Sequence, residues 1–155
     1  MLIVHYDGDR TALMPLFRLA DDSEQEIAAY RDQGTILVAR SDDDVIGYVQ
    51  ITDTDEPGTC EIKSMAVRET HQGQGVGSSL IRPAVELCKE KGARRVIVAT
   101  ATAGTANLRF YQLAGFRFAA IVRDAFSTAR GYPGGVMIDG IALQDQIILD
   151  QVIGE

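Results

Sequence analysis

The stretch EIKSMAVRETHQGQGVGS, residues 61–78, joins a strand pattern to a glycine-rich turn. Residues 61–67 carry long apolar side chains and contain no Pro, Asn or Gly, which is typical of a β-strand. After a polar link, Gly73, Gly75 and Gly77 stand at alternate positions and open the run VGSSLIRPAVELCKEK, whose apolar residues recur at helical spacing. The sequence therefore predicts a strand, a glycine-rich turn and a helix in succession.

A junction of this kind is suited to binding an anion. The first turn of a helix has backbone N–H groups without partners, and the helix dipole places partial positive charge on them. Glycines have no Cβ atoms that would hold a diphosphate away from these donors. The alternative interpretation is a tight strand-to-helix connection, in which the glycines only permit unusual backbone angles.

Two familiar phosphate-binding motifs do not fit this turn. A Walker A loop needs a lysine after its last glycine, but Gly77 is followed by Ser78 and Ser79. A dinucleotide-binding fingerprint needs Gly or Ala at the position of Ser78. It also needs an acidic residue about 20 positions further on, where the sequence has Arg94 and Arg95.

A third signature matches the turn. Residues 72–77, QGQGVG, resemble the Arg/Gln-x-x-Gly-x-Gly/Ala signature of the GNAT superfamily of acyl-coenzyme A-dependent N-acyltransferases. The strand before the turn also resembles the strand that precedes the signature in that family. Further along, Asn107, Tyr111, Gly115 and Phe116 resemble the second GNAT motif, Asn-x-x-x-Tyr-x-x-x-Gly-Phe. The resemblance covers residues 35–149 and is firmest at 61–116.

The resemblance implies a fold and a cosubstrate. The fold would be α/β (α+β), with a mixed, mostly antiparallel central sheet of about six to seven strands, about four flanking helices and a central βαβ crossover that carries the pyrophosphate loop. The acyl donor would be acetyl-CoA, and no metal is expected. The residues expected to bind the donor are Met65, Ala66, Val67, Gln72, Gly73, Gln74, Gly75, Val76, Gly77, Ser78, Asn107 and Phe110.

The same resemblance implies two catalytic residues. A protonated amine must lose a proton before it can attack a thioester. By resemblance Glu61 is the base, often through water, and Tyr111 is the acid that protonates the leaving thiolate. Backbone N–H groups around Met65 and Val67 would stabilise the developing oxyanion. The alternatives are a solvated strand residue for Glu61 and a core tyrosine for Tyr111. We expect direct transfer in a ternary complex, without an acyl-enzyme.

The acceptor is expected to be an amine on an unidentified small molecule or protein. A non-catalytic domain that binds acyl-CoA as a sensor is the alternative function. Residues that could contact the acceptor are Phe17, Asp21, Glu24, Tyr30, Asp124, Phe126 and Tyr132, and residues that could bind the 3′-phosphate of the donor are Arg82, Arg109 and Arg117.

Composition limits the remaining possibilities. The 155 residues predict a single domain, 1–155, and 15 basic against 22 acidic residues give a net charge of −7, which disfavours nucleic acid as a partner. No apolar run is long enough to span a membrane and no secretion signal is seen, so a cytoplasmic protein is expected. Cys60, Cys88 and two histidines form no familiar metal-binding spacing, and both cysteines are expected to be buried fillers. A homodimer is expected from the family resemblance alone.

The rest of the chain predicts the other elements. A first helix would be capped by Thr11, and a second would begin at Ser23 with Glu26 completing a capping box. Strands are expected at 35–40, 45–52, 95–100, 116–122 and, last, 144–149. Gly47 inside its strand indicates a bulge or a close backbone neighbour.

Overall fold

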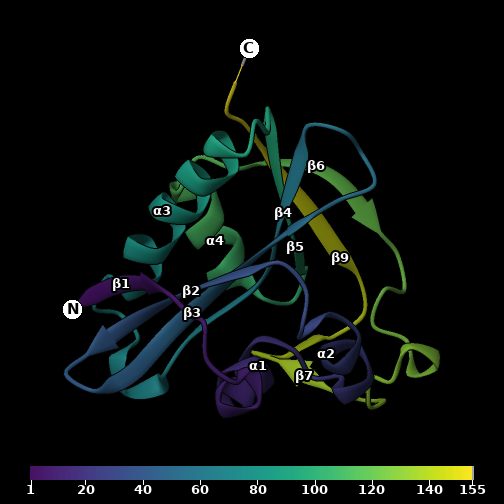
Figure 1. The fold of residues 1–155 in the computed structure, drawn as a ribbon. Helices are drawn as coiled ribbons and strands as arrows, with labels where there is room; N and C mark the ends of the chain where they lie inside the picture. The colour runs from purple at the N-terminus through teal and green to yellow at the C-terminus, as the bar shows by residue number, and fades with distance from the viewer. Residues whose placement is uncertain (155) are drawn as a thin grey trace.

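The computed structural model describes residues 1–154, and its main element is a seven-stranded sheet in the order β1-β2-β3-β4-β5-β9-β6 (Figure 1). The strands of this sheet are β1 (Leu2–His5), β2 (Thr35–Ser41), β3 (Asp44–Asp53), β4 (Thr59–Val67), β5 (Arg95–Ala101), β6 (Arg117–Val122) and β9 (Gln146–Val152). The α-helices are α1 (Met14–Ala20), α2 (Glu24–Tyr30), α3 (Val76–Glu90) and α4 (Thr105–Leu113), and a separate hairpin pairs β7 (Met137–Ile138) with β8 (Ile141–Ala142).

The sheet is antiparallel except at its centre, where β4 and β5 run parallel. Parallel neighbours need a crossover connection, and α3 supplies it. The expected mixed sheet, its four helices and its central βαβ unit are therefore confirmed. Although β6 precedes β9 in the chain, β9 lies between β5 and β6, so residues 123–145 make a long connection.

Each face of the sheet has its own hydrophobic core, because successive side chains of a strand point to opposite faces. On β2, Leu37 and Ala39 contribute to a core with α3 and α4. Ile36 and Val38, which alternate with these two residues along the strand, pack with α1 and α2 on the other face. Helices therefore cover both faces of the sheet (Figure 1).

Gly47 allows α3 to lie close to the sheet. A Cβ atom built at Gly47 would lie 3.1 Å from the Ala66 carbonyl oxygen and 3.3 Å from side-chain atoms of Val76 and Leu80. The pairing of β2 with β3 also shifts its register between Ala39 and Arg40, next to the partner of Gly47. Both expectations for this glycine, a bulge and a close neighbour, are confirmed.

Two expected boundaries differ in the structure. Asp9, not Thr11, caps the first helical segment, because its carboxylate accepts a hydrogen bond from the Thr11 N–H at 2.9 Å and a short 3-10 turn, Arg10–Leu13, precedes α1. The Thr11 N–H belongs to the first turn and needs an acceptor, and the Asp9 side chain, two residues earlier, provides it. The last strand, β9, ends at Val152 rather than near 149, since it pairs with β5 as far back as Arg95.

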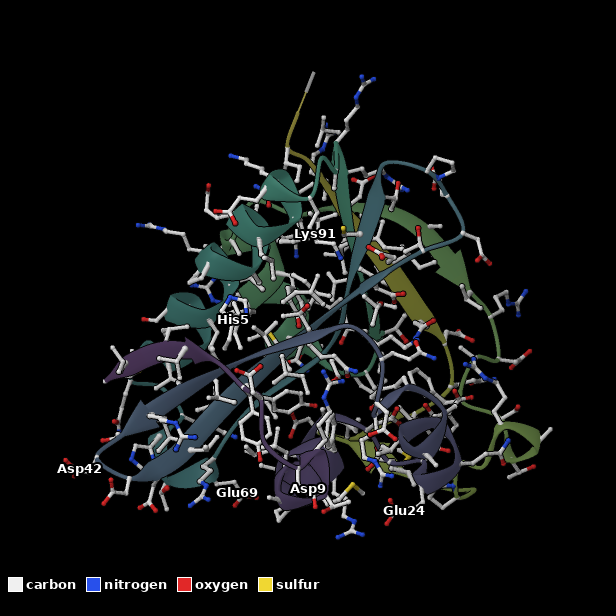
Figure 2. The ribbon with its side chains drawn as sticks, in the orientation of Figure 1. His5, Asp9, Glu24, Asp42, Glu69 and Lys91 are labelled. Atoms are coloured by element: carbon white, nitrogen blue, oxygen red, sulfur yellow. The ribbon has the colours of Figure 1, made fainter. Side chains whose placement is uncertain are left out.

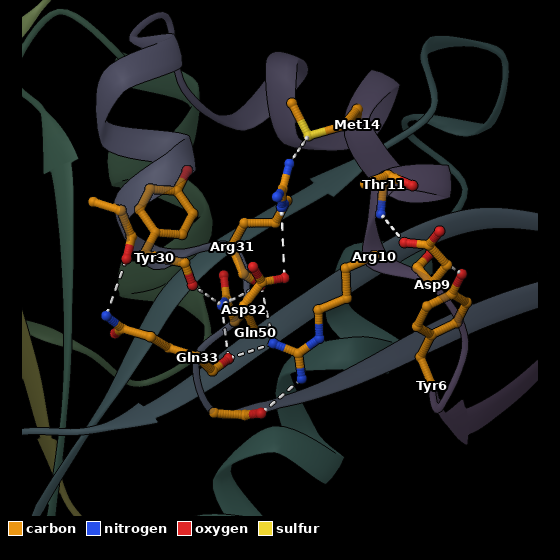
Figure 3. A network of polar contacts seen from close by, with 12 residues as sticks. Tyr6, Asp9, Arg10, Thr11, Met14, Tyr30, Arg31, Asp32, Gln33 and Gln50 are labelled. Atoms are coloured by element: carbon orange, nitrogen blue, oxygen red, sulfur yellow. Dashed lines mark hydrogen bonds and ion pairs between the residues drawn. The ribbon is translucent and has the colours of Figure 1, made fainter.

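The second helix begins at Ser23 as predicted, but Glu26 does not complete a capping box, because the Ser23 N–H donates to the Asp21 carboxylate and the Glu26 carboxylate pairs with Arg130. The Ser23 hydroxyl accepts from the Glu26 N–H at 3.1 Å at the start of α2. Beyond its end, the fully buried Gln50 amide donates to the carbonyls of Tyr30 (2.8 Å) and Gln33 (2.9 Å), and Arg10 donates to the Gln33 carbonyl as well (Figure 3). The Tyr30 carbonyl, which the helix end leaves without an intrahelical partner, also accepts from the Gln33 N–H at 3.0 Å, so each of these two carbonyls has two donors.

Cys60 and Cys88 are free and buried in the core beneath α3, as expected for apolar fillers. Across residues 1–154 no helix combines the length and the apolar character that crossing a membrane requires.

Candidate active site

The site begins where β4 and β5 separate. The parallel register pairs residues 59–62 of β4 with 95–98 of β5, yet β4 continues to Val67 and β5 to Ala101. Two clefts lie along the separated segments. The first, of about 540 Å³, is named here the glycine cleft and the second, of about 260 Å³, the glutamate cleft. Both are lined by Leu19, Ala20, Met65, Asn107 and Tyr111, so they share one wall.

The glycine cleft brings together the residues predicted to bind the donor. Of these, Met65, Ala66, Val67, Gln72, Gly73, Gly75, Val76, Gly77, Ser78, Asn107 and Phe110 line it. Gln74 does not line it, because its side chain turns back and donates to the Thr70 carbonyl at 3.3 Å. Leu19, Ala20 and His71 also line the cleft and were not predicted. Leu19 and Ala20 come from α1, and no local signal in the sequence relates that helix to the glycine turn.

The glycines of the turn have two different roles. Gly73 and Gly75 have φ of +76° and +83°, a region that costs other residues free energy, and a Cβ at either would meet no protein atom within 4 Å. Gly77 has ordinary helical geometry, but a Cβ there would lie 3.2 Å from the Phe110 ring. The first two glycines therefore shape an open turn, and the third lets α4 approach α3.

Backbone donors at this turn are unpaired within the helix. The first bond of α3 runs from the Ser79 N–H to the Gly75 carbonyl at 3.0 Å. The N–H groups of Val76, Gly77 and Ser78 consequently have no partner in the helix, and the helix dipole makes them positive. Together with the missing Cβ atoms, these donors form a cradle for an anion.

The backbone of β4 also presents donors to the cleft. The Arg68 N–H bonds to the Ile46 carbonyl at 2.8 Å, so it points toward β3. In an antiparallel pair this direction alternates along the strand, which places the Ala66 N–H toward β3 and the N–H groups of Met65 and Val67 on the other side. On that other side β5 has separated from β4. The N–H groups of Met65 and Val67, which are the predicted oxyanion donors, therefore face the glycine cleft.

The glutamate cleft is lined by four of the seven residues named as acceptor contacts. Asp21, Tyr30, Phe126 and Tyr132 line it, together with Glu61. Both Phe126 and Tyr132 belong to the long connection between β6 and β9, which the sequence alone did not place over α2.

The other three residues lie elsewhere. Phe17 is fully buried and packs on Tyr30 and Tyr48 in the core. Glu24 projects outward at the periphery of the molecule (Figure 2), where it pairs with Arg18 at 2.8 Å. Asp124 is exposed and lies in a turn with φ of +57°.

Glu61 stands in the glutamate cleft beside an irregularity of β4. The register with β3 passes from Ser64 opposite Gln50 to Ile62 opposite Ile51, so Lys63 is an extra residue. Burial raises the pKa of the Glu61 carboxyl above its ordinary value, and the Lys63 ammonium opposes this effect. A carboxyl with a raised pKa is a stronger base than a solvated one once it is ionised.

Tyr111 lies in the wall that the two clefts share. Its ring is buried and packs edge-on against Phe110 and Phe116, with ring centroids 5.1 and 5.8 Å away. Burial raises the pKa of its hydroxyl, which keeps the phenol protonated at neutral pH. The same side chain is thus part of the core and part of the cleft surface.

Of the three arginines named for the 3′-phosphate, Arg82 lies beside the glycine cleft. It lines a neighbouring hollow with Ser78 and Phe110, which line the glycine cleft as well. Arg117 lines a separate hollow over the edge of the sheet, and Arg109 is exposed on α4.

Comparisons with known proteins agree with this geometry. Residues 6–116 match the family model described as the acetyltransferase (GNAT) family. The uncharacterised N-acetyltransferase YvbK of Bacillus subtilis is 33% identical over 137 residues, which cover 88% of this chain and 86% of that protein. An IAA acetyltransferase structure from Bacillus cereus has a TM-score of 0.88 at 35% identity, covering 98% of this chain and 100% of the other. A GNAT acetyltransferase from Elizabethkingia anophelis with acetyl-CoA bound has a TM-score of 0.89 at 28% identity, with 98% and 97% covered. The chain therefore belongs to the GNAT family and is an N-acetyltransferase.

Proposed function

We propose that this protein transfers an acetyl group from acetyl-CoA to a primary amine, by direct attack of the amine on the thioester in a ternary complex. The observation that carries the proposal is the wall common to the two clefts, which includes Met65 and Tyr111. A donor in the glycine cleft and an amine in the glutamate cleft would meet at that wall. Direct transfer then needs no nucleophilic side chain.

Acetyl-CoA fits the glycine cleft by its chemistry. Its diphosphate would accept hydrogen bonds from the N–H groups of Val76, Gly77 and Ser78, and the absent Cβ atoms of Gly73 and Gly75 leave space for it. The narrow arm of the donor would then lie along β4, toward the shared wall. Relatives crystallised with acetyl-CoA or with CoA support this donor.

Each step of the transfer is assigned to a group that lines one of the two clefts. Glu61, directly or through a water, takes a proton from the ammonium group of the acceptor, which frees its lone pair. The amine nitrogen bonds to the acetyl carbon, and N–H groups of Met65 and Val67 stabilise the negative charge that develops on the carbonyl oxygen. The carbon–sulfur bond then breaks, and the leaving thiolate takes a proton from the Tyr111 hydroxyl. The nitrogen gives up the extra proton that it still carries, which restores the Tyr111 hydroxyl directly or through water. The products are an amide and free CoA.

The first experiment measures the thermal midpoint of the purified protein with and without acetyl-CoA, followed by thiol release with a panel of amines. A specific ligand raises the midpoint by an amount that grows with its concentration. We expect a rise, and thiol release that depends on the amine. No rise at saturating acetyl-CoA would refute the assignment of the donor.

Two variants separate the enzyme from a protein that only binds acyl-CoA. Glu61→Gln and Tyr111→Phe should both keep the rise in thermal midpoint and lose thiol release. A binding protein needs the glycine turn but neither titrating group. If both variants released thiol at the wild-type rate, the proposed acid and base would be wrong.

A further inference from the structure

Asp21 is a carboxylate that lines the glutamate cleft without a cationic partner. It caps the end of α1, and it accepts hydrogen bonds from the Tyr30 hydroxyl at 3.2 Å and the Ser23 N–H at 3.1 Å. Among residues 1–154 it forms no ion pair, and burial raises the pKa of its carboxyl. An unpaired, partly buried carboxylate is unfavourable for stability, so its position in a cleft points to a ligand.

The two cations and one further carboxylate of the cleft, Arg130, Lys63 and Glu26, interact with groups other than Asp21. Glu26 pairs with Arg130 at 3.2 Å, and the Arg130 guanidinium also donates to the Ala125 carbonyl. The Lys63 ammonium lies 5.4 Å from the centre of the Tyr30 ring and acts electrostatically on Glu61. Among residues 1–154, neither cation forms an ion pair with Asp21. Three carboxylates, Asp21, Asp22 and Glu61, therefore line the cleft without an ion pair among residues 1–154, and of these Asp22 is exposed.

The surroundings of Asp21 are aromatic. Tyr30 donates to it, and Tyr132 lines the same cleft. Phe126 packs edge-on against Tyr132 at 5.0 Å. A carboxylate beside aromatic rings favours an ammonium group, because both the charge and the ring faces attract it. The position of Lys63 over Tyr30 is an example of that attraction within the chain.

We propose that the acceptor is a diamine, or another amine with a second cationic group, and that Asp21 binds the second cation while the reacting amine lies at Glu61. The inference rests on the proposed function. It assigns Asp21 a role in substrate specificity and none in the chemical step.

The test compares acceptors that differ only at the far end. The measurement is thiol release from acetyl-CoA. Each α,ω-diamine in a series of increasing length is compared with the n-alkylamine and the ω-amino acid of the same length. We expect the best diamine to exceed the alkylamine in kcat/KM by about 10-fold or more, as expected for a charge-assisted hydrogen bond. The ω-amino acid should be the poorest acceptor.

Asp21→Asn removes the charge and keeps the shape of the side chain. Its amide oxygen can still accept from the Ser23 N–H, which binds Oδ1, while its NH2 group takes the place of Oδ2 and can donate to the Tyr30 hydroxyl oxygen. It should raise KM for the diamine about 10-fold, with little change in kcat and no change for the alkylamine. Asp43→Asn is the matched control, because Asp43 is exposed in the turn between β2 and β3 and lines none of the clefts described. The wild-type preference should persist in the control.

A second measurement does not need turnover. In the presence of CoA, the diamine should raise the thermal midpoint of the wild type and of Asp43→Asn, and not that of Asp21→Asn. Equal use of diamine and alkylamine, a preference for the ω-amino acid, or a diamine effect unchanged in Asp21→Asn would each overturn the proposal. Failure of acetyl-CoA to raise the midpoint at all would instead refute the proposed function, so the two failures are distinguishable.

Discussion

Gly75 and Gly92 stand at opposite ends of α3 and allow a matched test of the anion cradle. Gly75 precedes the helix with φ of +83°, and Gly92 follows it with φ of +86°. A Cβ at either position would meet no atom within 4 Å. Only Gly75 lines the glycine cleft. Alanine therefore has a similar conformational cost at the two positions. The variants differ in that only the methyl group at position 75 lies in the glycine cleft.

The expected magnitudes follow from this comparison. Left-handed backbone geometry costs an alanine about 1–2 kcal/mol, so both variants should lose about 1 kcal/mol of stability after the smaller entropy of the unfolded chain is included. For a chain of this size, that loss lowers the thermal midpoint by about 2–4 °C. In Gly75→Ala the methyl group would also hold the diphosphate away from at least one donor, at about 1.5–3 kcal/mol, which corresponds to about 10- to 150-fold in the dissociation constant for CoA.

The assay is isothermal titration calorimetry with CoA, alongside thermal unfolding of both variants. Gly92→Ala should bind CoA as the wild type does. If Gly75→Ala did so as well, while losing the same stability, the glycine would serve only the turn and the cradle would be refuted.

Three further variants test the site and its support. Tyr111→Phe should lower kcat about 100-fold and leave CoA binding unchanged, as measured by thiol release and calorimetry, because only the proton donor is removed; unchanged kcat would exclude it as the acid. Glu61→Gln should be at least as stable as the wild type at neutral pH, because burial raises the pKa of this carboxyl. Because its folded-state pKa is raised, the wild type gains stability as the pH falls through that pKa. The difference between the free energies of unfolding of Glu61→Gln and the wild type, measured in urea, should therefore shrink toward low pH. A difference that grows would contradict the raised pKa. Wild-type acetyl transfer should decline over the same pH range, since the base becomes protonated. Gln50→Leu should lower the free energy of unfolding by about 1–3 kcal/mol, because it removes one donor from each of two carbonyls and leaves the Ser64 hydroxyl without the acceptor that Gln50 provides. Gln33→Ala, which removes an exposed side chain, should change it by less than about 0.5 kcal/mol. Equal losses would show that the buried amide is not needed.

Local patterns in the sequence determined the centre of the molecule. The strand at 61–67, the alternate glycines and the apolar spacing after them are properties of neighbouring residues, and they appear in the structure as β4, the open turn and α3. Gly115 likewise follows the C-cap residue of α4 and has a φ of +99°, which a glycine adopts readily. Such features depend on backbone geometry over a few residues, which sequence spacing expresses directly.

The composition of the glutamate cleft was decided by tertiary structure alone. Residues 123–145 lie over α2 because β9 inserts between β5 and β6, and the connection is then held by the Ser23 hydroxyl, which donates to the Arg130 carbonyl at 3.0 Å. This contact joins positions 107 residues apart. No periodicity relates such distant positions, because sheet order and strand divergence depend on the packing of the whole chain. The sequence therefore located the glycine turn, and only the folded chain decided which of the seven residues named for the acceptor line the glutamate cleft.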